Sequence, residues 1–482
     1  MKKNLLFLLF LVAVCCGALQ AQPVRYLDEI FSTVKVDSNV VYGKNKSYLS
    51  GFNATQNLLM DVYRPDGDTA TNRPVVILMH AGSFLPGSVT GFTFADKYEH
   101  CIVEMCERFA KRGYVAVSMA YRLGWNPTAS TQEERSKTII NAVYRAMQDV
   151  RGCVRYFRST HADSSNMWGI DPGKFVLGGS NSGAYVALAA GNFNKPQEFL
   201  LTKLLDGVGL PFVDTTLTGN FEGFGGTQNL DNFPGYSSAF NCVLALGGAV
   251  ADTSFIEAGE PPVLAFQGLD EQLTPYNTAT VITTTLQPVV EVSGSGDFMP
   301  VVSKLGNNSG FAPNSFTPGP PNKQGGVFTT PVDGLYPFKG QTFEPWNWYN
   351  GTNPSINPTA SEAKAKLYID TIMGYSLPRL YRLMIDNTYG EPVIGLHEPK
   401  ATVEMNVYPN PAADVLNIFT NSLQQPMQAI ALYDLSGKLV KQVSNAGGFY
   451  ETIAVGDLNR GAYLLKVTLQ NGHTGSRVVT VQ

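Results

Sequence analysis

The stretch 174–190, KFVLGGSNSGAYVALAA, constrains the fold of this 482-residue chain more than any other. An apolar run at 175–177 stops at Gly178 and Gly179, and small residues at helical spacing follow the polar residues SNSG. A buried strand that turns at once into a helix holds its corner residue in a strained conformation, and flanking glycines let neighbouring backbone approach. We expect Ser180 at this corner, with its hydroxyl clear of the sheet edge and facing backbone N–H donors.

Apolar strands alternate with helical segments over the first three quarters of the chain. This alternation is typical of a doubly wound α/β fold, in which helices cover both faces of a mostly parallel sheet. Such sheets place their functional sites at the carboxyl ends of strands. The expected strands are 58–65, 75–79, 114–119, 175–177, 243–246 and 263–267, and the expected helices are 98–112, 139–158 and 361–386.

Length and charge narrow the class of protein further. A chain of 482 residues exceeds the size at which one core stops growing, so we expect two domains. A hydrophobic content of 44% with 15% charged residues fits a globular protein. The formal net charge of −4 gives no reason to expect a nucleic-acid partner.

The first 21 residues read as a secretory signal peptide. Lys2 and Lys3 precede an apolar run at 5–14, and small residues lead to a cleavage site after Ala21. Lipidation at the pair Cys15 and Cys16 is an alternative, but Val14 stands where a small residue should precede the modified cysteine. No later run is long and apolar enough to predict a transmembrane helix.

Four cysteines remain after the signal peptide: Cys101, Cys106, Cys153 and Cys242. In an exported protein they allow three complete disulfide pairings, and buried free thiols are an equally good interpretation. None of them has the spacing of a metal site, and the sequence predicts no metal and no cofactor.

The composition changes twice along the rest of the chain and so indicates where the first domain ends and the second begins. Apart from an expected strand and helix start near 289–305, residues 276–360 are rich in Gly, Pro, Asn, Thr and Ser with scattered aromatics. They predict a long loop insertion in a first domain at 22–387. A linker follows at 388–402. Residues 403–482 show short alternating strands, which predict a small all-β sandwich.

Several motifs in the first domain resemble the α/β-hydrolase fold, in particular its carboxylesterase and lipase-like members. The motifs are MDVYRP, HAGSF, YVAVSMAYRLG, QDVRGCVRYFR, GIDPGKFVLGGSNSG and QGLDEQLTP. They occur in the family's order over about residues 55 to 280, and this combination is more specific than any one motif. The resemblance implies a secreted serine hydrolase that acts on carboxylic esters.

The resemblance also implies roles for individual residues. Ser180 is the expected nucleophile, although the family's G-x-S-x-G pattern is shifted here, and Ser182 is a rival. The acid is expected at Glu271, four residues before Pro275, with Asp270 as the runner-up. Either carboxylate is adequate to orient a histidine.

Backbone donors and a histidine complete the expected site. The resemblance implies an oxyanion hole formed by the N–H groups of Gly82, Ser83 and Asn181. Downstream of the acid the chain has two histidines, and His397 is the candidate base. Residues 340–344 read GQTFE where relatives often carry a histidine, and without a general base a serine is a poor nucleophile.

The C-terminal segment 403–482 resembles the type A sorting domain of the type IX secretion system of Bacteroidota. The matching motifs are YPNP at 408–411, LYDLSGK at 432–438 and LNRGAY at 458–463. This resemblance implies export across the periplasm and outer membrane, with the secretion machinery as a partner, and release or attachment at the cell surface. A carbohydrate-binding β-sandwich is the alternative interpretation.

Two hypotheses about function follow. The first is a secreted ester hydrolase whose substrate is a small molecule or an acyl group on a polysaccharide. The second is a catalytically inactive protein of the same fold that binds a glycan or a peptide through aromatic side chains.

Overall fold

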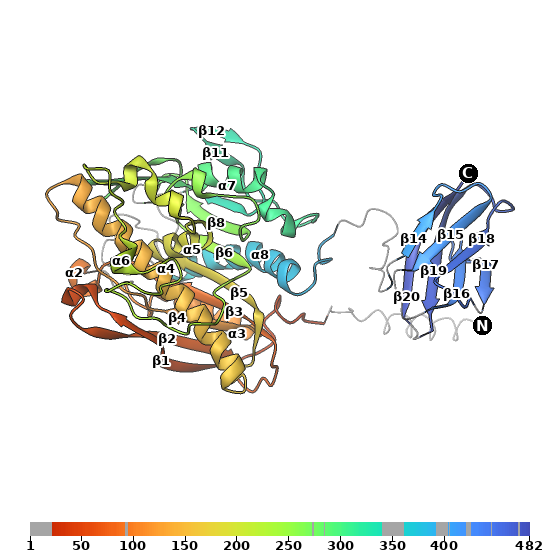
Figure 1. Ribbon diagram of the computed structural model, residues 1–482, viewed down its shortest axis with the longest axis horizontal. Helices are drawn as coiled ribbons and strands as arrows, with labels where there is room; N and C mark the ends of the chain where they lie inside the picture. The colour runs from red at the N-terminus through yellow and green to blue at the C-terminus, as the bar shows by residue number, and fades with distance from the viewer. Residues whose placement is uncertain are drawn as a thin grey trace, which may run out of the picture. The chain divides into compact units, whose positions relative to one another are not determined.

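The structure is a computed structural model that describes residues 22–91, 95–271, 274–283, 285–339, 361–391, 403, 405–420, 426–444, 446–470 and 473–482. The chain divides into two compact units, 1–391 and 392–482, and each is described by itself (Figure 1). The expected signal peptide at 1–21 and most of the expected linker lie outside the described residues.

An eight-stranded sheet forms the centre of the first unit. The strand order is β1-β2-β4-β3-β5-β6-β8-β13, with the β1–β2 and β2–β4 pairs antiparallel and the other pairs parallel. The central strands are short, continuous apolar runs, as expected for strands buried on both faces. The bounds are β1 Val34–Lys46, β2 Thr55–Pro65, β3 Arg73–Met79, β4 Val115–Met119, β5 Ile170–Ser180, β6 Cys242–Leu246, β8 Val263–Gly268 and β13 Leu335–Phe338.

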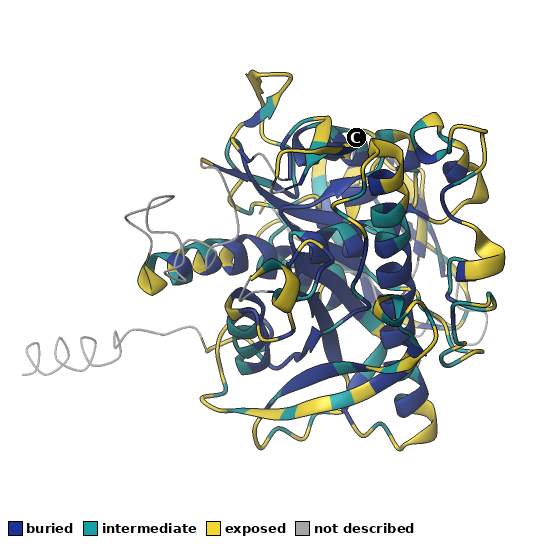
Figure 2. Ribbon diagram, turned by 90° about the vertical axis from the view of Figure 1, so that its left-hand side faces the viewer, coloured by how far each residue is buried: buried dark blue, intermediate teal, exposed yellow. Residues whose placement is uncertain are grey.

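Helices cover both faces of this sheet. Alternate residues of a strand point to opposite faces, so Val75 and Ile77 of β3 belong to one hydrophobic cluster and Val76 and Leu78 to the other. Helices α4 (Gln132–Asp163), α5 (Ser182–Asn192) and α7 (Ser295–Lys304) pack on the first face, and α3 (His100–Lys111) and α8 (Glu362–Met384) on the second. Figure 2 shows the central strands and the helix faces against them as buried.

Shorter elements connect these layers. The remaining short helices are α2 (Gly87–Thr90), α6 (Thr215–Thr218), η1 (Tyr48–Ser50), η2 (Pro196–Leu200), η3 (Thr202–Leu204), η4 (Thr253–Phe255) and η5 (Asn307–Phe311). The remaining strands are β7 (Ala249–Val250), β9 (Ala279–Ile282), β10 (Pro288–Gly294), β11 (Asn322–Gln324) and β12 (Val327–Thr329).

The expected loop insertion at 276–360 contains more regular structure than its composition suggests. Strand β10 pairs with both β7 and β9 in a separate antiparallel sheet, and α7 follows β10 directly. Strand β13 joins the main sheet beside β8. The strand and helix start expected near 289–305 lie where β10 and α7 are found, whereas β9 and β13 were not expected because each is only four residues long.

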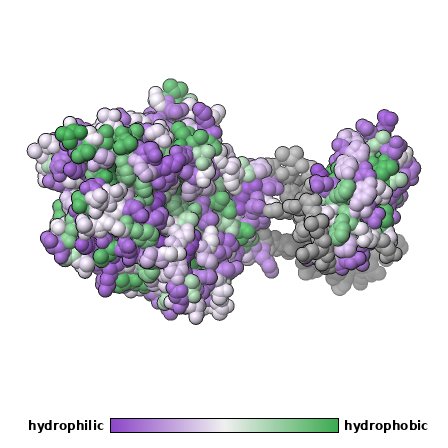
Figure 3. Space-filling view, in the orientation of Figure 1, coloured by the Kyte–Doolittle hydropathy of each residue, from purple (hydrophilic) through white to green (hydrophobic). Residues whose placement is uncertain are grey.

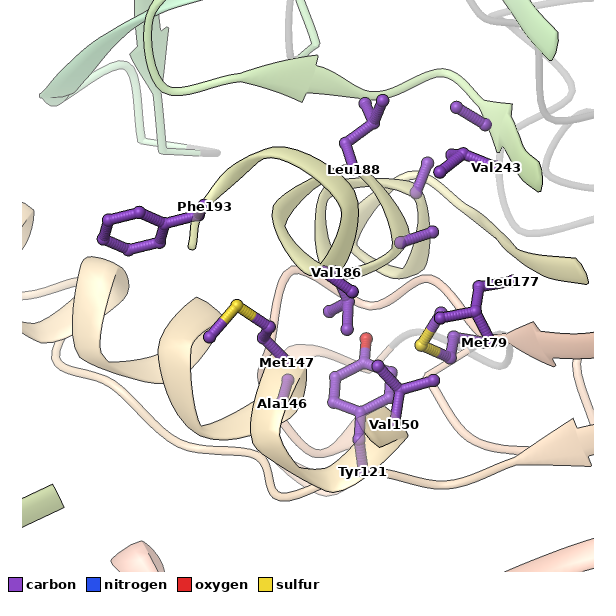
Figure 4. Packing of buried hydrophobic residues seen from close by; sticks show 14 of the residues in the cluster. Met79, Tyr121, Ala146, Met147, Val150, Leu177, Val186, Leu188, Phe193 and Val243 are labelled. Carbon is purple, nitrogen blue, oxygen red and sulfur yellow. The ribbon is translucent and has the colours of Figure 1, made fainter. Parts of the chain in front are cut away.

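Helix α5 is the most buried helix beside the central sheet. Figure 4 shows Val186 of α5 turned toward Met147 and Val150 of α4, with the ring of Tyr121 beneath α5. Apolar residues lie on almost every side of this helix, as expected where it is enclosed by other elements. Cys101, Cys106, Cys153 and Cys242 are also buried, and no disulfide joins any two of them in the described structure.

The second unit is a β-sandwich with two antiparallel sheets. One has the order β14-β15-β18 and the other β17-β16-β19-β20, and their inward residues form a separate hydrophobic cluster. The bounds are β14 Met405–Tyr408, β15 Val415–Thr420, β16 Met427–Tyr433, β17 Leu439–Ser444, β18 Tyr450–Ala454, β19 Gly461–Leu469 and β20 Thr474–Val481. Within the described part of the chain, no helix has the length and hydropathy needed to cross a bilayer.

Candidate functional site

Asn181 occupies the corner between β5 and α5. It is the N-cap residue of α5, with φ 48° and ψ −113°, a conformation that non-glycine residues rarely adopt. A nucleophile in the hydrolase fold sits at this kind of strained strand-to-helix turn. The structure therefore gives the nucleophile position to an amide side chain.

Two glycines fix this corner. A Cβ atom on Gly179 would lie 2.6 Å from the carbonyl oxygen of Met79, and one on Gly183 only 2.2 Å from the same atom. Both glycines are needed because the start of α5 crosses the end of β3 at backbone contact distance. They lie two residues before and two residues after Asn181, so the pattern is G-x-N-x-G with Asn181 at its centre.

Ser180 does not occupy the corner that the sequence analysis assigned to it. It is the last residue of β5 and pairs with Leu246 of β6. Its side chain is 0% exposed, and its hydroxyl has no hydrogen-bond partner among the described residues. The expected position was wrong by one residue because the pair Gly178-Gly179 favoured an early end to the strand.

The loop 81–85 lies beside this corner. Gly82, Ser83 and Phe84 all have positive φ, which turns the loop sharply after β3. No residue that the structure describes accepts a hydrogen bond from the N–H of Gly82 or of Ser83. Gly82 and Ser83 line the same cavity as Asn181.

The third expected oxyanion donor is unsuitable. The N–H of Asn181 donates to the carbonyl oxygen of Leu246 at 2.8 Å, so it is already used in holding β5 to β6. In a hydrolase elbow the donor is the N–H of the residue after the nucleophile. Here that residue is Ser182, the first residue of α5, whose N–H has no acceptor within the helix.

Buried polar groups brace the loop and the corner. A carboxylate oxygen of Glu99 accepts from the N–H of Ala81 at 2.6 Å. The hydroxyl of Tyr121 lies 2.9 Å from the carbonyl oxygen of His80, to which it donates, and 3.0 Å from Oγ of Ser182. Figure 4 shows this hydroxyl directed toward α5. The rival nucleophile Ser182 is therefore paired with a tyrosine and not with a base.

His80 cannot act as that base. Its Nδ1 lies 2.5 Å from the carbonyl oxygen of Ala81, and its ring stacks on Tyr121 with a centroid distance of 4.5 Å. Burial lowers the pKa of His80 to about 4. The imidazole is neutral near pH 7 and braces the loop.

The acid loop after β8 also reaches the corner. The hydroxyl of Thr274 donates to Oδ1 of Asn181 at 2.8 Å. Glu271 is 8% exposed, whereas Asp270 is exposed, so the runner-up acid faces outward. Burial raises the pKa of Tyr185 on α5, a hydrogen bond with Thr274 lowers it, and the charge of Glu271 raises it further.

The expected base, His397, lies outside the described residues, and so does the segment 340–344. Among the described residues, no histidine lines the cavity. The structure thus brings together the loop 81–85, the corner and the acid loop, without a described general base.

A cavity of about 810 Å³ opens from the corner along α5. Its walls come from the loop 81–85, from α4 and α5, and from the β7-β10-β9 sheet. Aliphatic and aromatic side chains predominate, and none of the lining residues that the structure describes is Asp, Glu, Lys, Arg or His. By contrast, the face of the first unit drawn in Figure 3 mixes hydrophilic and hydrophobic residues. The cavity therefore suits an uncharged, largely apolar ligand.

The sequence contained a signal for Asn181 that was not used. Glycines at i−2 and i+2 identify the residue between them as the one at the corner. No comparable sequence signal marks Tyr121 or Glu99, because their roles depend on contacts across the fold.

Two family models match the chain. Residues 60–209 match BD-FAE, a hydrolase-fold esterase domain, and residues 406–482 match the secretion system C-terminal sorting domain. None of the curated proteins matches the chain.

Solved structures similar to this chain include three of esterase 2 from Thermogutta terrifontis. The butyrate-bound enzyme is 16% identical, with 71% of this chain and 94% of that chain covered and a TM-score of 0.38. The paraoxon-phosphorylated enzyme is 17% identical, with 71% and 94% covered and a TM-score of 0.37. The tabun-phosphoramylated enzyme is 18% identical, with 72% and 97% covered and a TM-score of 0.37.

The first unit has an α/β-hydrolase fold. The strand order of its sheet, the strained turn between β5 and α5, and the family match at 60–209 together define it. Within this chain, residues 60–209 match a hydrolase-fold esterase domain, and residues 406–482 match a secretion system C-terminal sorting domain of the type IX kind. This domain directs export to the cell surface or release from the cell.

Proposed function

We propose that the first unit binds an uncharged, largely apolar small molecule in the cavity beside α5 and does not hydrolyse esters through a corner serine. The single observation that carries this proposal is the position of Asn181 at the corner, where a hydrolase needs a hydroxyl. An amide is not activated by a general base to attack a carbonyl. The apolar lining of the cavity supports binding as the remaining use of the fold.

Binding is tested on the full mature chain with N-phenyl-1-naphthylamine, a neutral apolar fluorophore. We expect saturable fluorescence enhancement that Val143→Trp weakens, because Val143 lines the cavity from α4. Lys137→Trp on the same helix is exposed and does not line the cavity, so it serves as the matched control. Thermal unfolding of both variants identifies any loss of fold. Equal saturation by the two folded variants would overturn binding in the cavity.

A serine ester hydrolase that uses Ser180, Glu271 and His397 is the second candidate. The esterase-domain match at 60–209 and the burial of Glu271 favour it. Its substrate would be a small carboxylic ester or an acyl group on a polysaccharide. Because the first proposal excludes a serine nucleophile, we expect the parent chain, Ser180→Ala and Ser182→Ala to hydrolyse p-nitrophenyl butyrate at the same rate. Turnover that Ser180→Ala alone removes would establish this second candidate and reject the first.

A further inference from the structure

The backbone of Asn181 is held in the geometry that closes an imide ring. At ψ −113° the amide nitrogen of Ser182 lies almost eclipsed with Cβ of Asn181 about the Cα–C bond. A five-membered ring through Cγ of Asn181 and this nitrogen requires that arrangement. Most asparagines must first distort their backbone to reach it, whereas here the fold has already imposed the strain.

The surroundings of Asn181 favour the same reaction. The N–H of Ser182 opens α5 and has no acceptor within the helix, so forming the imide breaks no helical hydrogen bond. The N-terminus of this 11-residue helix stabilises negative charge on the reacting groups. The hydroxyl of Thr274 already donates to Oδ1 of Asn181, the oxygen on which charge develops. Asn181 lines the cavity, which gives water access to it.

We propose that Asn181–Ser182 is a self-modification site at which the folded chain converts Asn181 to aspartate. The nitrogen of Ser182 attacks Cγ of Asn181, and the new N–Cγ bond replaces the Cγ–Nδ2 bond. Ammonia leaves with the proton from the Ser182 nitrogen. Water then adds to Cγ and breaks the new N–Cγ bond, so the Ser182 nitrogen regains its proton, the ordinary peptide bond is restored and residue 181 carries a carboxylate.

The product carries a charge where the starting chain has none. A carboxylate at the N-terminus of α5 is stabilised by the helix dipole and stands at the position of a hydrolase nucleophile. It is also the only charge that the described cavity lining would contain, so it would disfavour anionic ligands.

The chain contains a matched internal control. Asn308 is also followed by serine, but it lies in the 3-10 helix η5, where ψ is about −25° and the ring geometry is absent. Its side-chain oxygen accepts a hydrogen bond from the N–H of Val263, and its side-chain nitrogen donates one to the carbonyl oxygen of Asp333. The two dipeptides have the same local chemistry. A difference between their rates of amide conversion is therefore caused by the folded structure around them.

The test incubates the full mature chain at pH 8, folded and in urea, and follows each asparagine by peptide mapping and mass spectrometry. In the folded chain we expect conversion at Asn181 to exceed that at Asn308 by about tenfold or more. In urea the two rates should become equal. Peptide mapping also separates the Asn181 and Asn308 peptides from those that contain the Asn–Gly sequences at Asn350 and Asn471.

Two variants complete the experiment. Asn181→Gln cannot close a five-membered ring, so the mass change at this peptide should disappear, and Asn181→Asp supplies the reference product. An unchanged amide at Asn181 in the folded chain, over a time in which the chain in urea is converted at both positions, would overturn the proposal. Because the readout is chemical composition, this result is independent of whether the cavity binds an apolar probe.

Discussion

Gly183 at the start of α5 stands so close to Met79 at the end of β3 that a Cβ atom would lie 2.2 Å from the Met79 carbonyl oxygen. This contact brings the helix N-terminus and the loop 81–85 to the same edge of the sheet. The corner at Asn181 is therefore a consequence of how closely α5 crosses β3, and it exists without a serine at its tip.

The close crossing predicts a large penalty for Gly183→Ala. Backbone cannot move aside as a flexible side chain can, so we expect a loss of about 2–4 kcal/mol in the free energy of unfolding of the first unit, measured by denaturant titration. Gly374→Ala is the matched control, because Gly374 lies in α8 with open space around its Cα. It should stabilise by about 0.5–1 kcal/mol. Equal effects of the two changes would contradict this account of the corner.

The conformation of Asn181 predicts an unusual order of stability. Asn181→Gly and Asn181→Ala both lose the hydrogen bond from Thr274, but only glycine adopts positive φ without strain. We expect the glycine variant to be about 1 kcal/mol more stable than the alanine variant, despite the greater entropy of glycine in the unfolded chain. Thermal unfolding of the two variants side by side measures this difference, and a more stable alanine variant would refute it.

Ser180 and Ser182 should respond differently to loss of their hydroxyls. The hydroxyl of Ser180 is buried without a described partner, so Ser180→Ala should be neutral or stabilising by up to about 1 kcal/mol. Ser182→Ala breaks the contact with the Tyr121 hydroxyl and should destabilise by about 1 kcal/mol. Denaturant titration of both variants checks the contrast. A strongly destabilising Ser180→Ala would mean that its hydroxyl has a partner.

His80 predicts a dependence of stability on pH. Burial lowers its pKa from 6.5 in the unfolded chain to about 4 in the folded chain, so between these values the unfolded chain binds a proton that the folded chain does not. The contribution of His80 to the free energy of unfolding is fully present above pH 6.5. It is lost as the pH falls to 4, and the loss is roughly 3 kcal/mol. His80→Gln keeps an N–H donor for Ala81 and removes the titration, so its unfolding free energy should fall less over this range. Identical pH profiles for parent and variant would exclude His80 as the cause.

The alternation of apolar strands and helices was enough to predict the class of the first unit. Continuous apolar runs such as 75–79 identify strands that are buried on both faces, and their order along the chain indicates a parallel sheet. The alternating pattern after residue 403 likewise predicted the β-sandwich of the second unit. Strands β9 and β13 were missed because each is only four residues long, and strands this short resemble loops in composition.

The sequence by itself determined that a strand ends in a tight turn into a helix near residue 180, because glycines there allow close backbone contact. Only the tertiary structure decided which residue stands at the tip. The pairing of Ser180 with Leu246 extends β5 by one residue, and the crossing of α5 over Met79 fixes the turn at Asn181. A shift of one residue exchanges a hydroxyl for an amide, because side-chain direction at the end of a strand depends on its neighbours across the sheet and not on local sequence.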